Sequence, residues 1–270
     1  SGLLDGSASN SGSMDVASST MQGGSATILG EQVSVSGSVD ASGAAGGGSI
    51  NIGGDFQGGN PALTNAKTAD VTGTLAADSE VNGNGGRIIV WADGVTSFSG
   101  DLTATGVESG GFAEVSGKSV LNFSGSVDLT SESGVVGSLL LDPSNITISS
   151  ATDSSNSGNP NFAPDGTPTT SVLNLTTLNN ALASSNVTIT TTSGASERGD
   201  VTISGAIQPT GDTANNDLTI TADGSINMYS GSIDLNNGAL VLTAGQTASD
   251  GVIFISPSII ANSITAQSDD

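Results

Sequence analysis

The chain has 270 residues, of which 26 are acidic and 4 are basic, so its formal net charge is −22. With Lys67, Arg87, Lys118 and Arg198 as the only cations, it cannot present a basic surface to nucleic acid or to anionic lipid. The absence of histidine and cysteine excludes catalysis by these residues, imidazole or thiolate metal sites, and disulfides.

Paired glycines followed by alternating apolar residues recur in the first half of the chain. These segments span residues 23–28, 47–52, 85–90 and 110–115. Each predicts a turn that leads into a short strand. A second alternating element with a central glycine follows each pair, at residues 33–41, 71–75, 98–104 and 123–129.

The spacing of the glycine pairs defines a repeat. It is 24 residues from Gly24 to Gly48 and 25 from Gly86 to Gly111, whereas Gly48 to Gly86 spans 38 residues. We therefore predict a loop insertion of about 13 residues in the middle unit, around residues 55–61.

A period near 25 residues, with two or three short strands, predicts one coil of a parallel β-helix. Val, Ile, Leu and Phe would then face a narrow interior, and Ser, Thr, Asn and Asp would face water. Glycine is expected to supply corners with positive φ. At roughly 22 residues and about 4.8 Å per coil, we expect ~12 coils in a rod of ~60 Å.

The second half keeps the alternation without the glycine pairs, for example at residues 187–190, 201–207, 218–222 and 240–244. Residues 153–170 contain Pro160, Pro164 and Pro168 and predict a loop. Within residues 176–184, apolar side chains at spacings of three and four predict a helix. We therefore expect coils over residues 1–150, a loop and short helix over 151–186 with the helix around 171–185, and further coils over 187–270.

The order of several segments resembles a known family. These are "GGSINIGGDFQGGNPALTNA", "GNGGRIIVWADGVTSFSGDLTA", "GGFAEVSGKSVLNFSGSVDL", "SLLLDPSNITIS" and "LNNALASSNVTITTTSG". From about Gly23 to Ala206 the chain resembles the filamentous-haemagglutinin type of large exoprotein, which uses two-partner secretion. The resemblance implies an all-β, right-handed parallel β-helix, exported through an outer-membrane pore partner to the surface of a Gram-negative bacterium or cyanobacterium. It also implies roles in adhesion, aggregation or biofilm formation.

That family also has a signal peptide and an amino-terminal secretion domain with an Asn-Pro-rich motif. Neither is recognisable in this sequence, and Asn60-Pro61 and Asn159-Pro160 lack the context of that motif. We therefore expect an internal or processed segment that has no secretion function of its own.

Aspartates recur about once per turn, and carboxylates suit a hard cation such as calcium. The candidate ligands are Asp40, Asp55, Asp93, Asp101 and Asp128. No Gly-Gly-x-Gly-x-Asp motif with a nine-residue period accompanies them, so we expect solvated turn residues, with bound structural calcium as the alternative. Further turn aspartates are Asp70, Asp78 and Asp142.

No pair of carboxylates stands out for glycoside hydrolysis. Glu108 and Glu114 flank Gly110-Gly111 on a predicted turn. We therefore predict no catalytic residues, no cofactor and no enzyme activity. Trp91 and Tyr229 could form a platform that stacks on sugars, but Trp91 follows three apolar strand residues and is expected to pack.

The sequence thus favours a structural or adhesive segment of a secreted or cell-surface exoprotein. Its expected partners are a host or neighbouring cell surface, glycans, or further copies of itself, and neither nucleic acid nor an inserted membrane segment is expected. A self-stacking subunit of an extracellular filament is the first alternative. A β-helical carbohydrate-active enzyme is the second.

Overall fold

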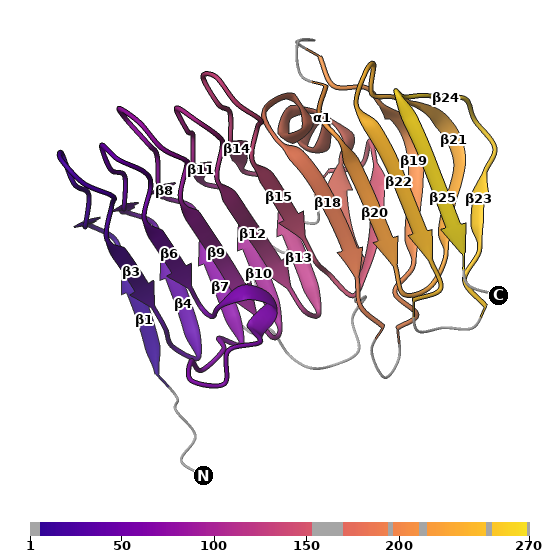
Figure 1. Cartoon of the computed structure of the whole chain (residues 1–270). Coiled ribbons are helices and arrows are strands. Elements are labelled where there is room, and N and C mark those ends of the chain that lie inside the picture. Colours follow the sequence, from indigo (N-terminus) through magenta and orange to yellow (C-terminus); the bar gives the residue numbers. More distant parts are fainter. Residues whose placement is uncertain (1–5, 153–169, 194–196, 211–214, 247–249, 269–270) are drawn as a thin grey trace.

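The computed structural model describes residues 6–152, 170–193, 197–210, 215–246 and 250–268. They form a parallel β-helix with one short α-helix (Figure 1), as predicted. The predicted loop that contains Pro160, Pro164 and Pro168 lies outside the described residues. Among the described residues, no helix has the length and apolar character needed to cross a bilayer.

One sheet runs the length of the molecule, and we call it the long sheet. In the described residues this sheet has nine strands, one for each coil. That is fewer than the ~12 coils expected, because loops and the helix take up part of the chain. In chain order they are β3 (Ser25–Ile28), β6 (Ser49–Ile52), β9 (Arg87–Ala92), β12 (Phe112–Gly117), β15 (Ser138–Leu141), β18 (Asn186–Thr191), β20 (Leu218–Ala222), β22 (Ala239–Ala244) and β25 (Ser263–Ser268).

The predicted repeat sets the register of the long sheet. The residues that follow the four glycine pairs, Ser25, Ser49, Arg87 and Phe112, pair with one another in successive strands. The repeat seen in the sequence is therefore the coil of the structure.

The second element of each early coil is two strands, because its central glycine turns the chain from one sheet to the next. The second sheet contains β1 (Ser7–Asn10), β4 (Gln32–Val35), β7 (Thr68–Val71), β10 (Val95–Phe98) and β13 (Val120–Phe123). The third sheet contains β2 (Ser13–Asp15), β5 (Ser38–Asp40), β8 (Thr74–Ala76), β11 (Asp101–Thr103) and β14 (Ser126–Asp128).

The fourth sheet belongs to the later coils. It contains β17 (Thr170–Asn174), β16 (Asn145–Ser149), β19 (Val201–Ile207), β21 (Ile226–Asp234) and β23 (Ile253–Ile255), with β24 (Ile259–Ile260) paired to β21. Strand β17 follows β16 in the chain but contacts β13 of the second sheet, where the Leu121 N–H donates to Ser171 Oγ at 2.8 Å.

The interior is a column of aliphatic side chains that stack coil on coil. Ile50, Ile88, Ala113 and Leu139, all with 0% exposure, are aligned in neighbouring strands of the long sheet. The largest side chains in the interior are Phe98 and Phe123, which face each other from β10 and β13 with ring centroids 5.7 Å apart. Burial of these side chains is the main force that holds the coils together.

The paired glycines are required by close packing, and the expected positive φ is wrong for them. A Cβ on Gly110 would lie 1.9 Å from the Leu129 carbonyl oxygen and 2.3 Å from the Gly137 nitrogen, and the φ of Gly110 is not in the left-handed region. Backbone of the same coil and of the next coil approaches so closely that only glycine fits. A positive φ occurs instead at sites such as Gly53, where φ is 74° at the start of the inserted loop.

Helix α1 (Leu175–Ser184) interrupts the stack of coils. It begins one residue before the predicted segment, because Asn174 is the N-cap and its Oδ1 accepts from the Thr176 N–H at 2.8 Å. The helix covers the last strand of the third sheet, since Ser184 Oγ donates to the Val127 carbonyl at 2.6 Å. Leu178 and Leu182 complete the contact as buried core side chains.

Candidate functional site

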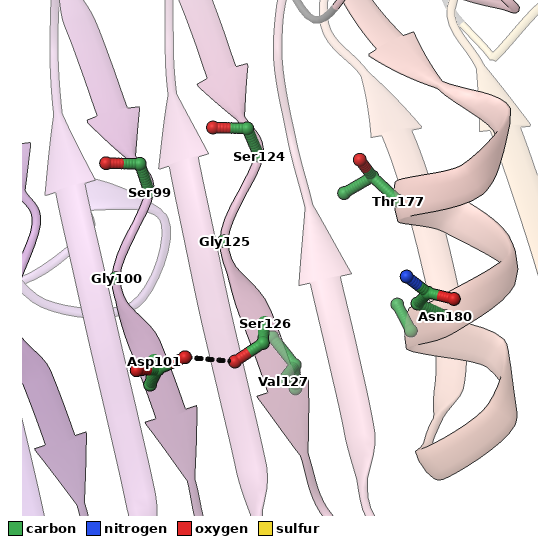
Figure 2. A pocket seen from close by; sticks show the side chains of 10 residues that line it. Ser99, Gly100, Asp101, Ser124, Gly125, Ser126, Val127, Thr177 and Asn180 are labelled. Carbon is green, nitrogen blue, oxygen red and sulfur yellow. Dashed lines mark hydrogen bonds between the residues drawn. The ribbon is translucent and has the colours of Figure 1, made fainter.

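A pocket of about 320 Å³ lies where α1 replaces the strand that would continue the third sheet. In Figure 2, Thr177 and Asn180 of α1 are drawn beside the corners of two successive coils, and Ser126 hydrogen-bonds to Asp101. The lining residues are Ser99, Gly100, Asp101, Ser124, Gly125, Ser126, Val127, Thr177, Asn180 and Ala181.

The chemistry of this α1 pocket is that of a polar binding site. It offers hydroxyl groups, one amide and one carboxylate, and two of its lining residues are glycines. Asp101 and Asn180 are both exposed to solvent. Such donors and acceptors can hydrogen-bond to the hydroxyl groups of a small polar ligand.

Each of the five predicted calcium ligands accepts hydrogen bonds locally. Asp40 Oδ1 accepts from the Ser42 N–H at 2.9 Å, and Asp128 Oδ1 accepts from the Thr130 N–H at 3.0 Å. Asp101 is in the α1 pocket, and Asp55 and Asp93 are at the inserted loop. In the part of the chain that the structure describes, no three acidic residues gather closely enough to hold a metal ion.

The inserted loop folds over the outer face of the long sheet. It contains the short 3₁₀ helix η1 (Phe56–Gly58), which contacts β9. Asp55 caps this helix through the Phe56 N–H and pairs with Arg87 at 3.0 Å. At the far end of the loop, the Asn65 side-chain amide donates to Asp93 at 3.0 Å. These contacts fix both ends of the loop to the coils.

The loop buries Trp91, which was predicted to pack inside the protein. Trp91 is 4% exposed and its Nε1–H donates to Asp93 at 3.1 Å. Gly54 and Gly58 lie against the ring, and a Cβ on Gly58 would be 2.6 Å from Trp91 Nε1. Trp91 therefore cannot stack on a sugar, whereas Tyr229 is 63% exposed beside Phe254, with ring centroids 5.5 Å apart.

The predicted turn position of Glu114 is wrong. Glu114 lies within β12 on the outer face of the long sheet, and the inserted loop covers it, so its exposure is 0%. The Gln57 N–H, at φ 51°, donates to both carboxylate oxygens at 3.2 and 3.1 Å. Phe56 and Phe112 pack together nearby, with ring centroids 5.9 Å apart.

Burial raises the pKa of Glu114 from 4.5 to about 7, and the Gln57 N–H, the Ser116 hydroxyl and Arg87 oppose this rise only in part. Asp142, on the next coil, is 6% exposed, and burial raises its pKa as well. Alternation in the sequence places both residues on the outer face, where solvent is expected. The 13-residue insertion was the only feature of the sequence that indicated a cover over part of this face.

The stability of the chain should therefore fall as pH rises from about 5 to about 8 when divalent cations are removed. Below pH 4.5, which is the pKa of Glu114 in the unfolded chain, Glu114 is protonated in both the folded and the unfolded state. Between pH 4.5 and about 7 only the folded state retains it, and above that both states are ionised. The linkage predicts a loss on the order of 3 kcal/mol. Guanidinium denaturation across this range should show the loss, and Glu114→Gln should remove most of it; an equal loss in both proteins would contradict the assignment.

Comparison of the chain with protein-family models and with curated proteins gives no match. The similarity to filamentous-haemagglutinin exoproteins therefore remains a prediction from the segments quoted above.

Proposed function

We propose that this chain is a structural and adhesive segment of a secreted or cell-surface exoprotein of a Gram-negative bacterium or cyanobacterium. The parallel β-helix is consistent with an extended stalk, because each coil packs only on its neighbours. The net charge of −22 favours hydration and solubility of such a stalk. Export through an outer-membrane pore partner and a role in biofilm formation belong to this proposal.

The α1 pocket is the observation that supports the adhesive part of this proposal. It is a concave polar site on the side of a rod, built from two coils and a helix. Its single carboxylate and the strongly negative chain would repel an acidic glycan. We therefore propose a neutral saccharide on a cell surface as its ligand.

A glycan array tests this assignment. Wild-type chain should bind a set of neutral glycans, and Asp101→Ala combined with Asn180→Ala should lower that binding about tenfold or more, since a hydrogen bond to a charged group contributes roughly 1.5–3 kcal/mol. Thr74→Ala is the matched control, because Thr74 pairs with Asp101 one coil away and lies outside the pocket lining. Equal binding by all three proteins, or no glycan bound by any, would contradict the proposal.

The second candidate is a subunit that stacks end to end into a filament. The last described coil supports it, because Phe254, Ile260 and Ile264 are 46%, 57% and 51% exposed there. Strand edges with exposed apolar side chains invite pairing with another chain. Electron microscopy of the isolated protein would separate the two candidates, since discrete short rods favour the adhesive segment and growing fibres favour the filament.

We also propose that the chain has no enzyme activity. The buried pair Glu114 and Asp142 lies beneath a loop rather than in an open groove suited to a polysaccharide. Incubation with a panel of polysaccharides should release no oligosaccharide, and any release would overturn this part of the proposal.

A further inference from the structure

Beneath the inserted loop, three successive coils place oxygen atoms side by side. Val115 pairs with Leu141, and Leu141 pairs with Ile189. The residues that follow these three are Ser116, Asp142 and Thr190, which continue the same register on the outer face. Glu114 precedes Ser116 by two residues and therefore points to the same face of β12.

Two of these hydroxyl oxygens are buried without a hydrogen bond of ordinary geometry: Ser116 Oγ and Thr190 Oγ1. Ser116 has 0% exposure and its hydroxyl lies beside the Glu114 carboxylate, while the Thr190 hydroxyl lies beside Asp142. Buried polar atoms in folded proteins nearly always have partners. These two therefore indicate a ligand between the carboxylates.

The charges around the cluster leave it negative. Asp223 also acts on Asp142, and the nearest guanidinium, that of Arg87, pairs with Asp55. The donors that face Glu114 are the Gln57 N–H and the Ser116 hydroxyl, and those that face Asp142 are the hydroxyls of Thr190 and of Thr192, the latter at 3.3 Å. The Gln57 side chain also reaches Asp142, so one loop residue contacts both carboxylates.

Two buried carboxylates without a buried cation are costly, so a proton or a cation must neutralise them. A proton would reduce the charge but leave Ser116 Oγ and Thr190 Oγ1 without a hydrogen bond of ordinary geometry, whereas a hard cation uses carboxylate, hydroxyl and amide oxygens together. We propose that Glu114, Ser116, Asp142 and Thr190 form a site for a hard divalent cation such as Ca²⁺, closed by the side chain of Gln57. None of the five aspartates predicted from the sequence belongs to it.

The cation would join the inserted loop to three coils of the long sheet. With only two carboxylates, the site belongs with the weak sites of extracellular proteins, for which dissociation constants are on the order of 0.1–1 mM. It would act as a structural clamp on this face of the stalk.

Thermal unfolding of the full chain at about pH 8 provides the test, in chelator and then in millimolar CaCl₂. Calcium should raise the Tm of the wild type by several degrees and should leave the Tm of Glu114→Gln and of Asp142→Asn unchanged. Asp128→Asn, which changes a turn aspartate on another face, should respond as the wild type does. An unchanged wild-type Tm would show that no cation binds between the carboxylates and would overturn the proposal.

Terbium luminescence of the wild type tests the same site if a variant fails to fold. Trp91 is the only tryptophan of the chain and pairs with Ser116 in the neighbouring strand. Excitation of Trp91 in the wild type should therefore sensitise bound Tb³⁺, and Ca²⁺ should displace the emission. Absence of sensitised emission from the folded wild type would contradict a cation site at this position.

Discussion

Replacement of Phe98 by alanine is expected to lower the free energy of unfolding by about 3–5 kcal/mol. The ring of Phe98 has 0% exposure and stacks on Phe123 at an interplanar angle of 13°. Since neighbouring coils pack on both sides, the interior has little freedom to close over the lost volume. Guanidinium denaturation followed by circular dichroism would measure the change.

Phe254→Ala is the matched control for this substitution. Phe254 is the same residue type but is 46% exposed on the outside of the last described coil. Its removal should cost about 1 kcal/mol or less. If Phe98→Ala were no more destabilising than Phe254→Ala, the two strands β10 and β13 would not face a common interior and the coil assignment would be wrong.

Gly110→Ala should destabilise the chain by about 3 kcal/mol, at the upper end of the range for overpacking. The added Cβ would overlap the backbone atoms Leu129 O and Gly137 N, which cannot rotate away as a side chain can. Relief would require neighbouring coils to move apart, at the expense of their hydrogen bonds. Thermal and chemical unfolding of the variant would measure the loss.

Gly12→Ala provides the comparison, because no atom lies within 4 Å of a Cβ built at that glycine. This control should leave stability within about 0.5 kcal/mol of the wild type. Equal effects at the two positions would mean that the paired glycines are not held against neighbouring backbone.

The coil could be predicted from the sequence because its signals are local. Glycine pairs mark the corners where backbone crowds, and alternation after each pair marks a strand with one buried face, as at Gly110 and β12. Both repeat within about 25 residues, so they are visible without any long-range information. The helix was also predictable, since its apolar spacing differs from that of the strands.

The features on which the functional proposals rest could not be predicted in this way. The burial of Glu114 depends on Gln57, which is 57 residues away, and the α1 pocket joins Asn180 to Asp101 from segments that are far apart in the sequence. A strand residue on the outer face looks solvated until the element that covers it is known. Alternation shows on which face of the sheet a side chain lies, but it does not show which element covers that face.

The most direct test of the central claim is the attachment of protein-coated microspheres to glycosylated cell surfaces. Microspheres that carry the wild-type chain should adhere well above albumin-coated ones, and the combined Asp101→Ala and Asn180→Ala substitutions should abolish most of that adhesion. Adhesion of wild-type microspheres no greater than that of albumin-coated ones would contradict the claim that this segment itself attaches to surfaces.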